Sequence, residues 1–87
     1  MSKKHIITLE KIFERPTRAD ITWREVENLF KAVGSEVKEG RGSRMRITKN
    51  NAILRLHKPH PQKEVKKYAV EEIRKFLALI KCTPGKA

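Results

Sequence analysis

The sequence contains a single cysteine, Cys82, among its 87 residues. One cysteine cannot form an internal disulfide, and cysteines cannot supply a zinc site. No apolar run approaches the ~20 residues that a membrane-spanning helix needs, and Thr8, Glu10 and Lys11 interrupt the segment where an apolar signal region would lie. A Gly-rich phosphate loop, a carboxylate pair and a cluster of metal ligands are also missing. We therefore expect a cytoplasmic protein with no membrane segment, no metal and no cofactor.

Acidic residues are scarce in this sequence. Asp and Glu number 10 against 21 Lys and Arg, which gives a formal net charge of +11. Residues 1–34 carry seven basic and five acidic side chains (+2), whereas residues 35–87 carry fourteen and five (+9). So much positive charge repels itself and indicates a polyanionic partner, with nucleic acid as the first candidate and an anionic membrane surface as the second. The binding surface is expected within residues 35–87.

Three helices and three strands are predicted from the spacing of apolar residues and from the positions of Gly, Pro and Asn. The second helix is the best defined, because Thr22-Trp23-Arg24-Glu25 matches a capping box and Gly34 suits the end of a helix. The helices are expected over 5–14, 23–33 and 65–80, and the strands over 35–39, 44–48 and 52–57. The predicted fold class is α+β, ααβββα in order, with the helices on one face of a three-stranded antiparallel sheet in two layers.

The first helix is predicted because five apolar residues fall roughly at helical spacing, namely Ile6, Ile7, Leu9, Ile12 and Phe13. The last helix is expected to bury a stripe made of Val65, Tyr68, Ala69, Ile73, Phe76, Leu77 and Ile80. Trp23 and Tyr68 are expected mainly in the core, and Cys82 is expected to be inert because no partner base is suggested near it.

A two-residue turn at Asn50-Asn51 sets the register of the second hairpin, because Asn tolerates positive φ. Counting outward from the turn pairs Ile47 with Leu54, Met45 with Leu56, Arg46 with Arg55 and Arg44 with His57. The four apolar residues then share the inner face. A slip of one residue would mix apolar and polar side chains on each face of the hairpin. Each apolar side chain moved out of the core would cost ~1.5–3 kcal/mol, so this register is predicted to be the stable one.

The outer face of this hairpin is predicted to carry three arginines and one histidine. They are Arg44, Arg46, Arg55 and His57. Arginines can stabilise charge on a phosphate, and histidine exchanges protons near neutral pH. The alternative is a solvated basic sheet face with an incidental histidine, and the pattern gives the two readings about equal weight.

Several consecutive segments resemble the HicA toxins. These are Glu39-Gly40-Arg41-Gly42-Ser43, the basic hairpin, Lys58-Pro59-His60-Pro61 and the Lys-rich residues 63–67, and the resemblance covers roughly Thr22 to Ile80. It implies a fold like that of double-stranded-RNA-binding domains, metal-independent endoribonuclease cleavage of mRNA, and a HicB-like antitoxin partner in a type II toxin–antitoxin system. Residues 1–21 would form an N-terminal helical extension and loop, residues 22–82 the core, and residues 83–87 a flexible tail.

The chain departs from the HicA pattern at one important position. HicA proteins usually carry a catalytic histidine directly after the Gly-Ser pair, whereas Arg44 and Met45 follow Gly42-Ser43 here. The predicted register offers a substitute, because His57 lies across the ladder from Arg44. The catalytic residues are accordingly predicted to be His57 and Arg44. The RNA-binding residues are predicted to be Arg46, Arg55, Lys58, His60, Lys63, Lys66 and Lys67.

Two other functions are compatible with the sequence. One is a non-catalytic RNA-binding module with the same fold, which has lost its chemistry together with the missing histidine. The other is a DNA-binding protein, which is less favoured because no helix carries an evident set of base-reading residues.

Overall fold

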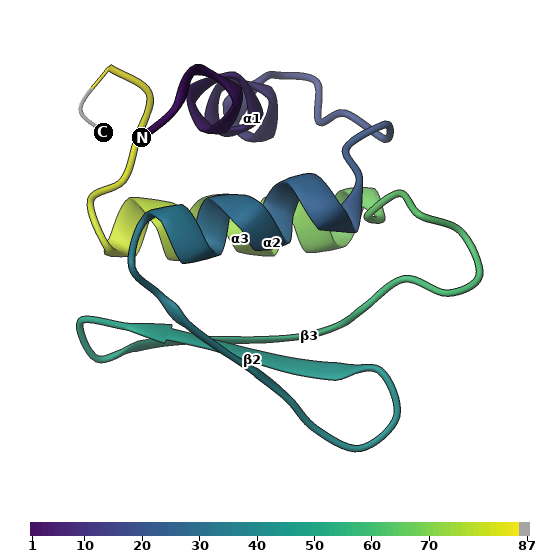
Figure 1. The fold of residues 1–87 in the computed structure, drawn as a ribbon. Coiled ribbons are helices and arrows are strands. Elements are labelled where there is room, and N and C mark those ends of the chain that lie inside the picture. The colour runs from purple at the N-terminus through teal and green to yellow at the C-terminus, as the bar shows by residue number, and fades with distance from the viewer. Residues whose placement is uncertain (86–87) are drawn as a thin grey trace.

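The structure, a computed structural model, describes residues 1–85. Its elements are α1 (Lys3–Phe13), α2 (Trp23–Ala32), β1 (Glu36–Glu39), β2 (Arg44–Lys49), β3 (Ala52–His57) and α3 (Lys67–Leu79). Helices α2 and α3 cover one face of the three-stranded sheet, which confirms the predicted ααβββα, α+β fold, and α1 packs on the far side of these two helices (Figure 1). None of the helices within residues 1–85 is long and apolar enough to cross a membrane.

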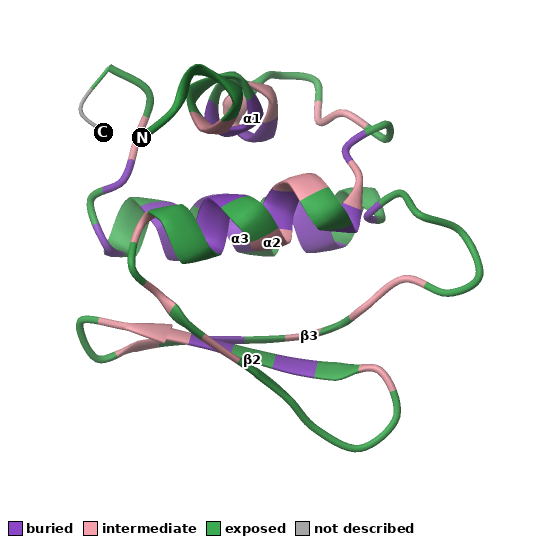
Figure 2. Ribbon diagram, in the orientation of Figure 1, coloured by how far each residue is buried: buried purple, intermediate pink, exposed green. Residues whose placement is uncertain are grey.

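Helices α2 and α3 lie between α1 and the sheet, and the hydrophobic core fills both of these contacts (Figure 2). Its most deeply buried side chains are Leu9, Ile12, Ile21, Val26, Leu29, Phe30, Ile47, Val70, Ile73 and Leu77. Phe30 meets Phe76 edge to face with ring centroids 5.8 Å apart, and Trp23 is buried as predicted. The outer face of the sheet is left for polar side chains.

Helix α2 begins at the capping box that the sequence predicts. The Glu25 N–H donates to Thr22 Oγ1 at 3.2 Å, and the Thr22 N–H donates to Glu25 Oε1 at 3.0 Å. These two bonds satisfy backbone donors that a helix start otherwise leaves free. Just beyond the other end, Gly34 has a φ of 82°, a left-handed conformation that glycine adopts without strain.

The sheet has the order β1-β2-β3 with both pairs antiparallel. The β2–β3 register is the predicted one, from Lys49 opposite Ala52 to Arg44 opposite His57. Asn50 and Asn51 have φ values of 52° and 68°, as a type I′ hairpin turn requires. Met45, Ile47 and Leu54 are buried on the inner face, and Leu56 is partly buried there.

The predicted start of the last helix is wrong by two residues. Helix α3 begins at Lys67, because the preceding segment is extended and bonded to the start of α2. The Val65 N–H donates to the Ile21 carbonyl at 2.8 Å, and the Trp23 N–H donates to the Lys63 carbonyl at 2.9 Å. Lys63 and Lys66 therefore precede the helix. Val65 is still buried, as part of this pairing rather than of a helical stripe.

One predicted core residue, Tyr68, is instead exposed, and so are two apolar residues of α1. Tyr68 is 61% exposed, because the buried face of α3 runs through Ala69, Val70 and Ile73 and leaves Tyr68 beside it. Ile6 and Ile7 are each 42% exposed, since α1 turns Thr8, Leu9 and Ile12 inward. The predicted tail over 83–87 lies partly outside the described residues.

A buried arginine ties α1 to the rest of the molecule. Arg74 is 8% exposed, and its Nε donates to the Ile12 carbonyl at 2.9 Å. The same guanidinium donates to the Glu14 carbonyl at 3.2 Å and to Thr17 Oγ1 at 3.0 Å. The end of a helix presents free carbonyls and partial negative charge, so a guanidinium there is favourable. Arg74 thus fixes the orientation of α1 on α3.

Candidate nucleic-acid interface

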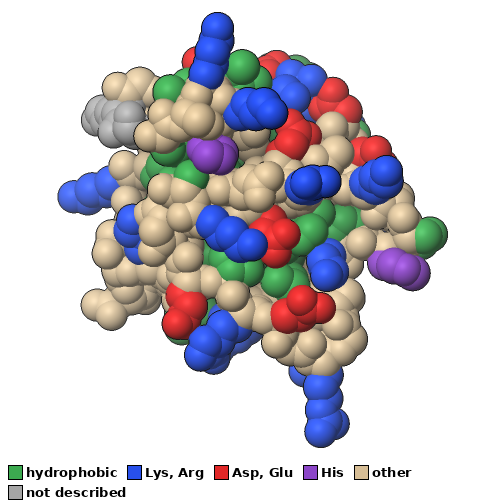
Figure 3. Space-filling view, viewed as in Figure 1, with side chains coloured by type: hydrophobic (Ala, Val, Ile, Leu, Met, Phe, Trp, Pro, Cys, Tyr) green, Lys and Arg blue, Asp and Glu red, His purple; other side chains and the backbone are tan. Residues whose placement is uncertain are grey.

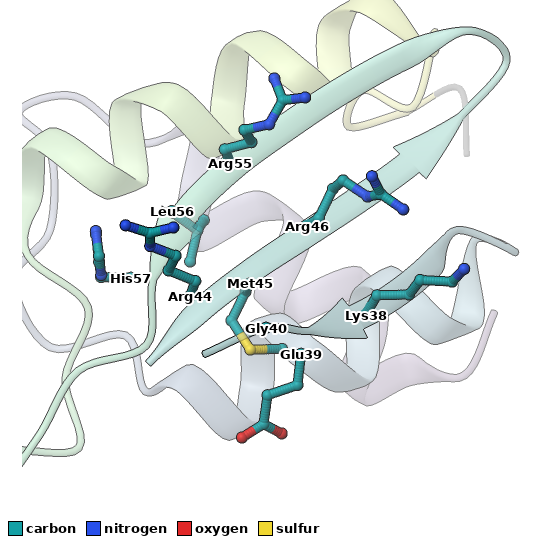
Figure 4. A pocket seen from close by; sticks show the side chains of 9 residues that line it. All are labelled: Lys38, Glu39, Gly40, Arg44, Met45, Arg46, Arg55, Leu56 and His57. Carbon is teal, nitrogen blue, oxygen red and sulfur yellow. The ribbon is translucent and has the colours of Figure 1, made fainter. Parts of the chain in front are cut away.

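The outer face of the sheet presents a row of cations that runs across all three strands. Lys38 on β1 is opposite Arg46 on β2, and Arg46 is opposite Arg55 on β3. All three are exposed, and Figure 4 shows them projecting from the same face. Like charges directly opposite one another destabilise a sheet. The arrangement is therefore costly to the free protein and suited to an anion that lies across the strands.

A hollow of about 600 Å³, here called the arginine hollow, lies along this row (Figure 4). Its lining residues are Lys38, Glu39, Gly40, Arg44, Met45, Arg46, Arg55, Leu56 and His57. Four of these side chains are cationic and one is acidic. The acidic one, Glu39, is paired with Lys58 at 3.5 Å, which reduces its repulsion of an incoming phosphate.

His57 lies at one end of the arginine hollow, with its imidazole beside the Arg44 guanidinium (Figure 4). Its Nδ1 is 3.4 Å from Ser43 Oγ, so the imidazole is next to the Gly42-Ser43 pair although it belongs to another strand. The Lys58 N–H donates to the Ser43 carbonyl at 2.7 Å and holds the end of β3 against residue 43. The backbone thus fixes the position from which an exposed imidazole reaches the hollow.

A second hollow of about 260 Å³, here called the loop hollow, lies between the end of β3, the loop after it and the start of α3. It is lined by Ser43, His57, Lys58, Pro59, His60, Gln62, Val65, Lys66, Tyr68 and Ala69. His57 lines both hollows. His57 therefore lies where a nucleic-acid strand that occupies both hollows would cross from one to the other.

The predicted site residues fall into two groups. The structure brings Arg44, Arg46, Arg55 and His57 together at the arginine hollow, and it places Lys58, His60 and Lys66 with His57 at the loop hollow. Lys63 lines a separate depression beside Trp23 and Pro61, and Lys67 lines none of these hollows.

Lys38 is a site residue that the sequence reasoning missed. The signal was present, since Val37 is an apolar residue between the polar Glu36 and Lys38, and such alternation puts Lys38 on the outer face. What was lacking was the β1–β2 register, because the connection at residues 40–43 is longer and less regular than the Asn50-Asn51 turn.

On the face of the molecule that Figure 3 shows, basic side chains are mixed with acidic ones. Arg18 pairs with Glu14 at 2.8 Å and with Asp20 at 2.6 Å, and Lys11 pairs with Glu25 at 3.2 Å. Within residues 1–85, no three His, Cys, Asp or Glu side chains cluster so that they could hold a metal ion. The arginine hollow is therefore distinguished by its row of cations and by the imidazole at its end.

Comparison with known families gives one match. The model of the family described as the HicA toxin of bacterial toxin-antitoxin matches residues 23–79, from the first residue of α2 to the last of α3. No curated protein and no solved structure matches the chain. The matched residues include all those that line the two hollows. Helix α1 lies outside the match.

Proposed function

The chain belongs to the HicA family of toxins of bacterial toxin–antitoxin systems, and from this premise we propose that it is an endoribonuclease that cleaves mRNA without a metal. The observation that carries the proposal is the position of His57. Its imidazole lies 3.4 Å from the hydroxyl of Ser43, beside the place where HicA proteins usually carry their histidine, and it adjoins the arginine hollow. A proton-transfer group and a phosphate-binding surface are thus side by side.

The proposed reaction is an internal transesterification of RNA. His57 takes the proton of a 2′-hydroxyl, whose oxygen forms a bond to the adjacent phosphorus. The bond from phosphorus to the 5′-oxygen breaks, and that oxygen takes a proton from the imidazolium or from water. Arg44, Arg46 and Arg55 stabilise the charge on the pentacoordinate phosphate. The products are a 2′,3′-cyclic phosphate and a 5′-hydroxyl.

A synthetic RNA and its 2′-deoxy counterpart test this function directly. The purified protein should cleave the RNA in the presence of EDTA and leave a 2′,3′-cyclic phosphate. An otherwise identical oligonucleotide with a 2′-deoxyribose at the cleaved position should bind but stay intact. Cleavage that needs a divalent metal would contradict the mechanism.

The second candidate function is RNA binding without cleavage. It is favoured by the replacement of the usual histidine with Arg44 and Met45 after Gly42-Ser43. Tight binding of both oligonucleotides with no cleavage of either would support this candidate and exclude the nuclease.

A further inference from the structure

Tyr68 is an exposed aromatic residue on the wall of the loop hollow. It lies in the first turn of α3 and is 61% exposed, whereas the next two residues, Ala69 and Val70, are buried at 5% and 0%. The ring contributes little to the core, yet it lines the loop hollow on whose wall His57 also lies. An exposed aromatic ring in a basic hollow is the feature on which the bases of single-stranded nucleic acids stack.

We propose that the loop hollow is a nucleobase subsite, in which a base next to the scissile phosphate stacks on Tyr68. The inference deepens the proposed ribonuclease function and rests on it. It adds a substrate class, since a base must be unpaired to enter the hollow, and single-stranded RNA offers such bases.

The connectivity of the two hollows supports this placement. A phosphate bound by Arg44 and next to His57 lies at the junction of the hollows, because His57 lines both. The nucleotide on one side of that phosphate continues over the cation row of the sheet. The loop hollow adjoins the other side of that phosphate, so the next nucleotide can reach Tyr68 there.

The polar groups around the loop hollow suit the edge of a base and its backbone. The side-chain amide of Gln62 can donate and accept hydrogen bonds, and so can the His60 imidazole. Lys66 is the N-cap of α3, without a side-chain cap hydrogen bond, and the first turn of α3 contains no acidic residue. Cationic charge and free backbone N–H groups there favour a phosphate beside the stacked base.

The walls of the loop hollow are held in place before any ligand binds. The Lys58 N–H is bonded to the Ser43 carbonyl at 2.7 Å on one side, and the Val65 N–H is bonded to the Ile21 carbonyl at 2.8 Å on the other. Pro59 and Pro61 restrict the backbone between them. A preformed site loses little entropy on binding.

Binding of an uncleavable RNA separates this subsite from catalysis. The probe is the single-stranded oligonucleotide with 2′-deoxyribose at the cleaved position, and its dissociation constant is measured for the wild type, Tyr68→Ala, Tyr68→Trp and Leu79→Ala. Tyr68→Ala should weaken binding about 5- to 150-fold, the range expected for one lost stacking contact. Tyr68→Trp should bind like the wild type. Leu79, 72% exposed at the far end of α3, is the matched control and should have no effect.

An abasic probe identifies the contact as stacking on a base. Removal of the base next to the cleaved position should weaken binding by the wild type to the same degree, and should cost Tyr68→Ala nothing further. If Tyr68→Ala binds the intact probe as tightly as the wild type, the proposed subsite is wrong. Cleavage that depends on His57 would still support the ribonuclease function in that case. If the abasic penalty is the same in both proteins, Tyr68 acts elsewhere and the subsite is also wrong. If the wild type neither binds nor cleaves RNA, both proposals fall.

Discussion

His57 and His60 are three residues apart but have different surroundings. His57 ends β3, lies next to Arg44 and Ser43, and lines both hollows, whereas His60 lies in the loop between Pro59 and Pro61 and lines only the loop hollow. A group that transfers a proton in the reaction must lie within hydrogen-bond reach of the reacting oxygen. By position, His57 is the better candidate for the proton transfer and His60 for RNA contact.

We therefore expect His57→Ala to lower the cleavage rate by about 10²- to 10⁴-fold, the usual cost of removing a general acid–base residue. RNA affinity should change little, since the arginines remain. His60→Ala should weaken binding more than it slows cleavage. Single-turnover cleavage and growth after induced expression measure both effects. Full toxicity of His57→Ala together with an inert His60→Ala would reverse the assignment.

At the scale of the elements, the start of α2 depends on the charge of Glu25. Burial alone would raise the pKa of this carboxyl, but the hydrogen bonds from the Thr22 N–H, the Lys11 ammonium and the Thr22 hydroxyl outweigh it and leave the pKa below its ordinary value of 4.5. A lowered folded-state pKa means stability that is present above the unfolded-state pKa and lost as the pH falls through the folded-state pKa.

Glu25→Gln should remove that pH-dependent stability and little else, because Gln can complete the capping box with Thr22. The variant should be less stable than the wild type by about 0.5–1 kcal/mol at neutral pH, a typical value for a partly exposed ion pair such as that with Lys11. The difference should shrink toward zero as the pH falls through the lowered pKa of Glu25, because the carboxyl then becomes neutral in the wild type as well. Urea unfolding across this range measures it. A constant difference at all pH values would show that the charge is not responsible.

The joint between α1 and α3 depends on Arg74. Its guanidinium makes three hydrogen bonds to the end of α1 and the loop after it, and Arg74→Ala leaves carbonyls there without a donor. We expect a loss of about 2–3 kcal/mol in the free energy of unfolding. Lys75→Ala, an exposed neighbour in the same helix, should change it by less than about 0.5 kcal/mol. Equal effects of the two substitutions in urea unfolding would remove Arg74 from this role.

The elements differ in how far the sequence predicts them. The register of the β2–β3 hairpin is predicted correctly, because its turn residues and its strict alternation allow a single register. The burial of Arg74 is not predicted, because apolar periodicity identifies only the apolar residues of a helix. Nothing in the sequence near Arg74 indicates that it donates to carbonyls at the end of α1. The burial of Tyr68 is predicted wrongly because the predicted helix begins at Val65, which in the structure belongs to an extended segment bonded to residues 21–23, around the start of α2. That pairing is a long-range contact and has no local pattern.

For the whole molecule, the net charge of +11 should govern affinity for RNA. If about 4–6 phosphates are contacted, log affinity should fall with log salt at about −0.7 per phosphate of a single strand. Arg46→Ala should lower the slope by roughly one phosphate's share. Filter binding or fluorescence anisotropy at several salt concentrations gives the slopes. A flat dependence would contradict an electrostatic interface.

The family implies a cognate antitoxin, and we expect it to be HicB-like, acidic, and bound over the outer face of the sheet. Complementary charge speeds association with such a face, and Ile53, 54% exposed there, supplies apolar area to bury. Co-expression should rescue growth, and the two proteins should co-purify. Ile53→Asp should weaken the complex by 10-fold or more while leaving the fold intact. A complex that is insensitive to this substitution would place the antitoxin elsewhere.

The layer order has a practical consequence for such measurements. Helix α1 is separated from the sheet by α2 and α3 (Figure 1), so a fluorophore on its outward side would report binding without touching the arginine hollow. The native thiol would not compete for the dye, because Cys82 is buried and burial raises its pKa. A cysteine introduced at Ile7, 42% exposed on α1, would therefore be labelled selectively in the folded protein.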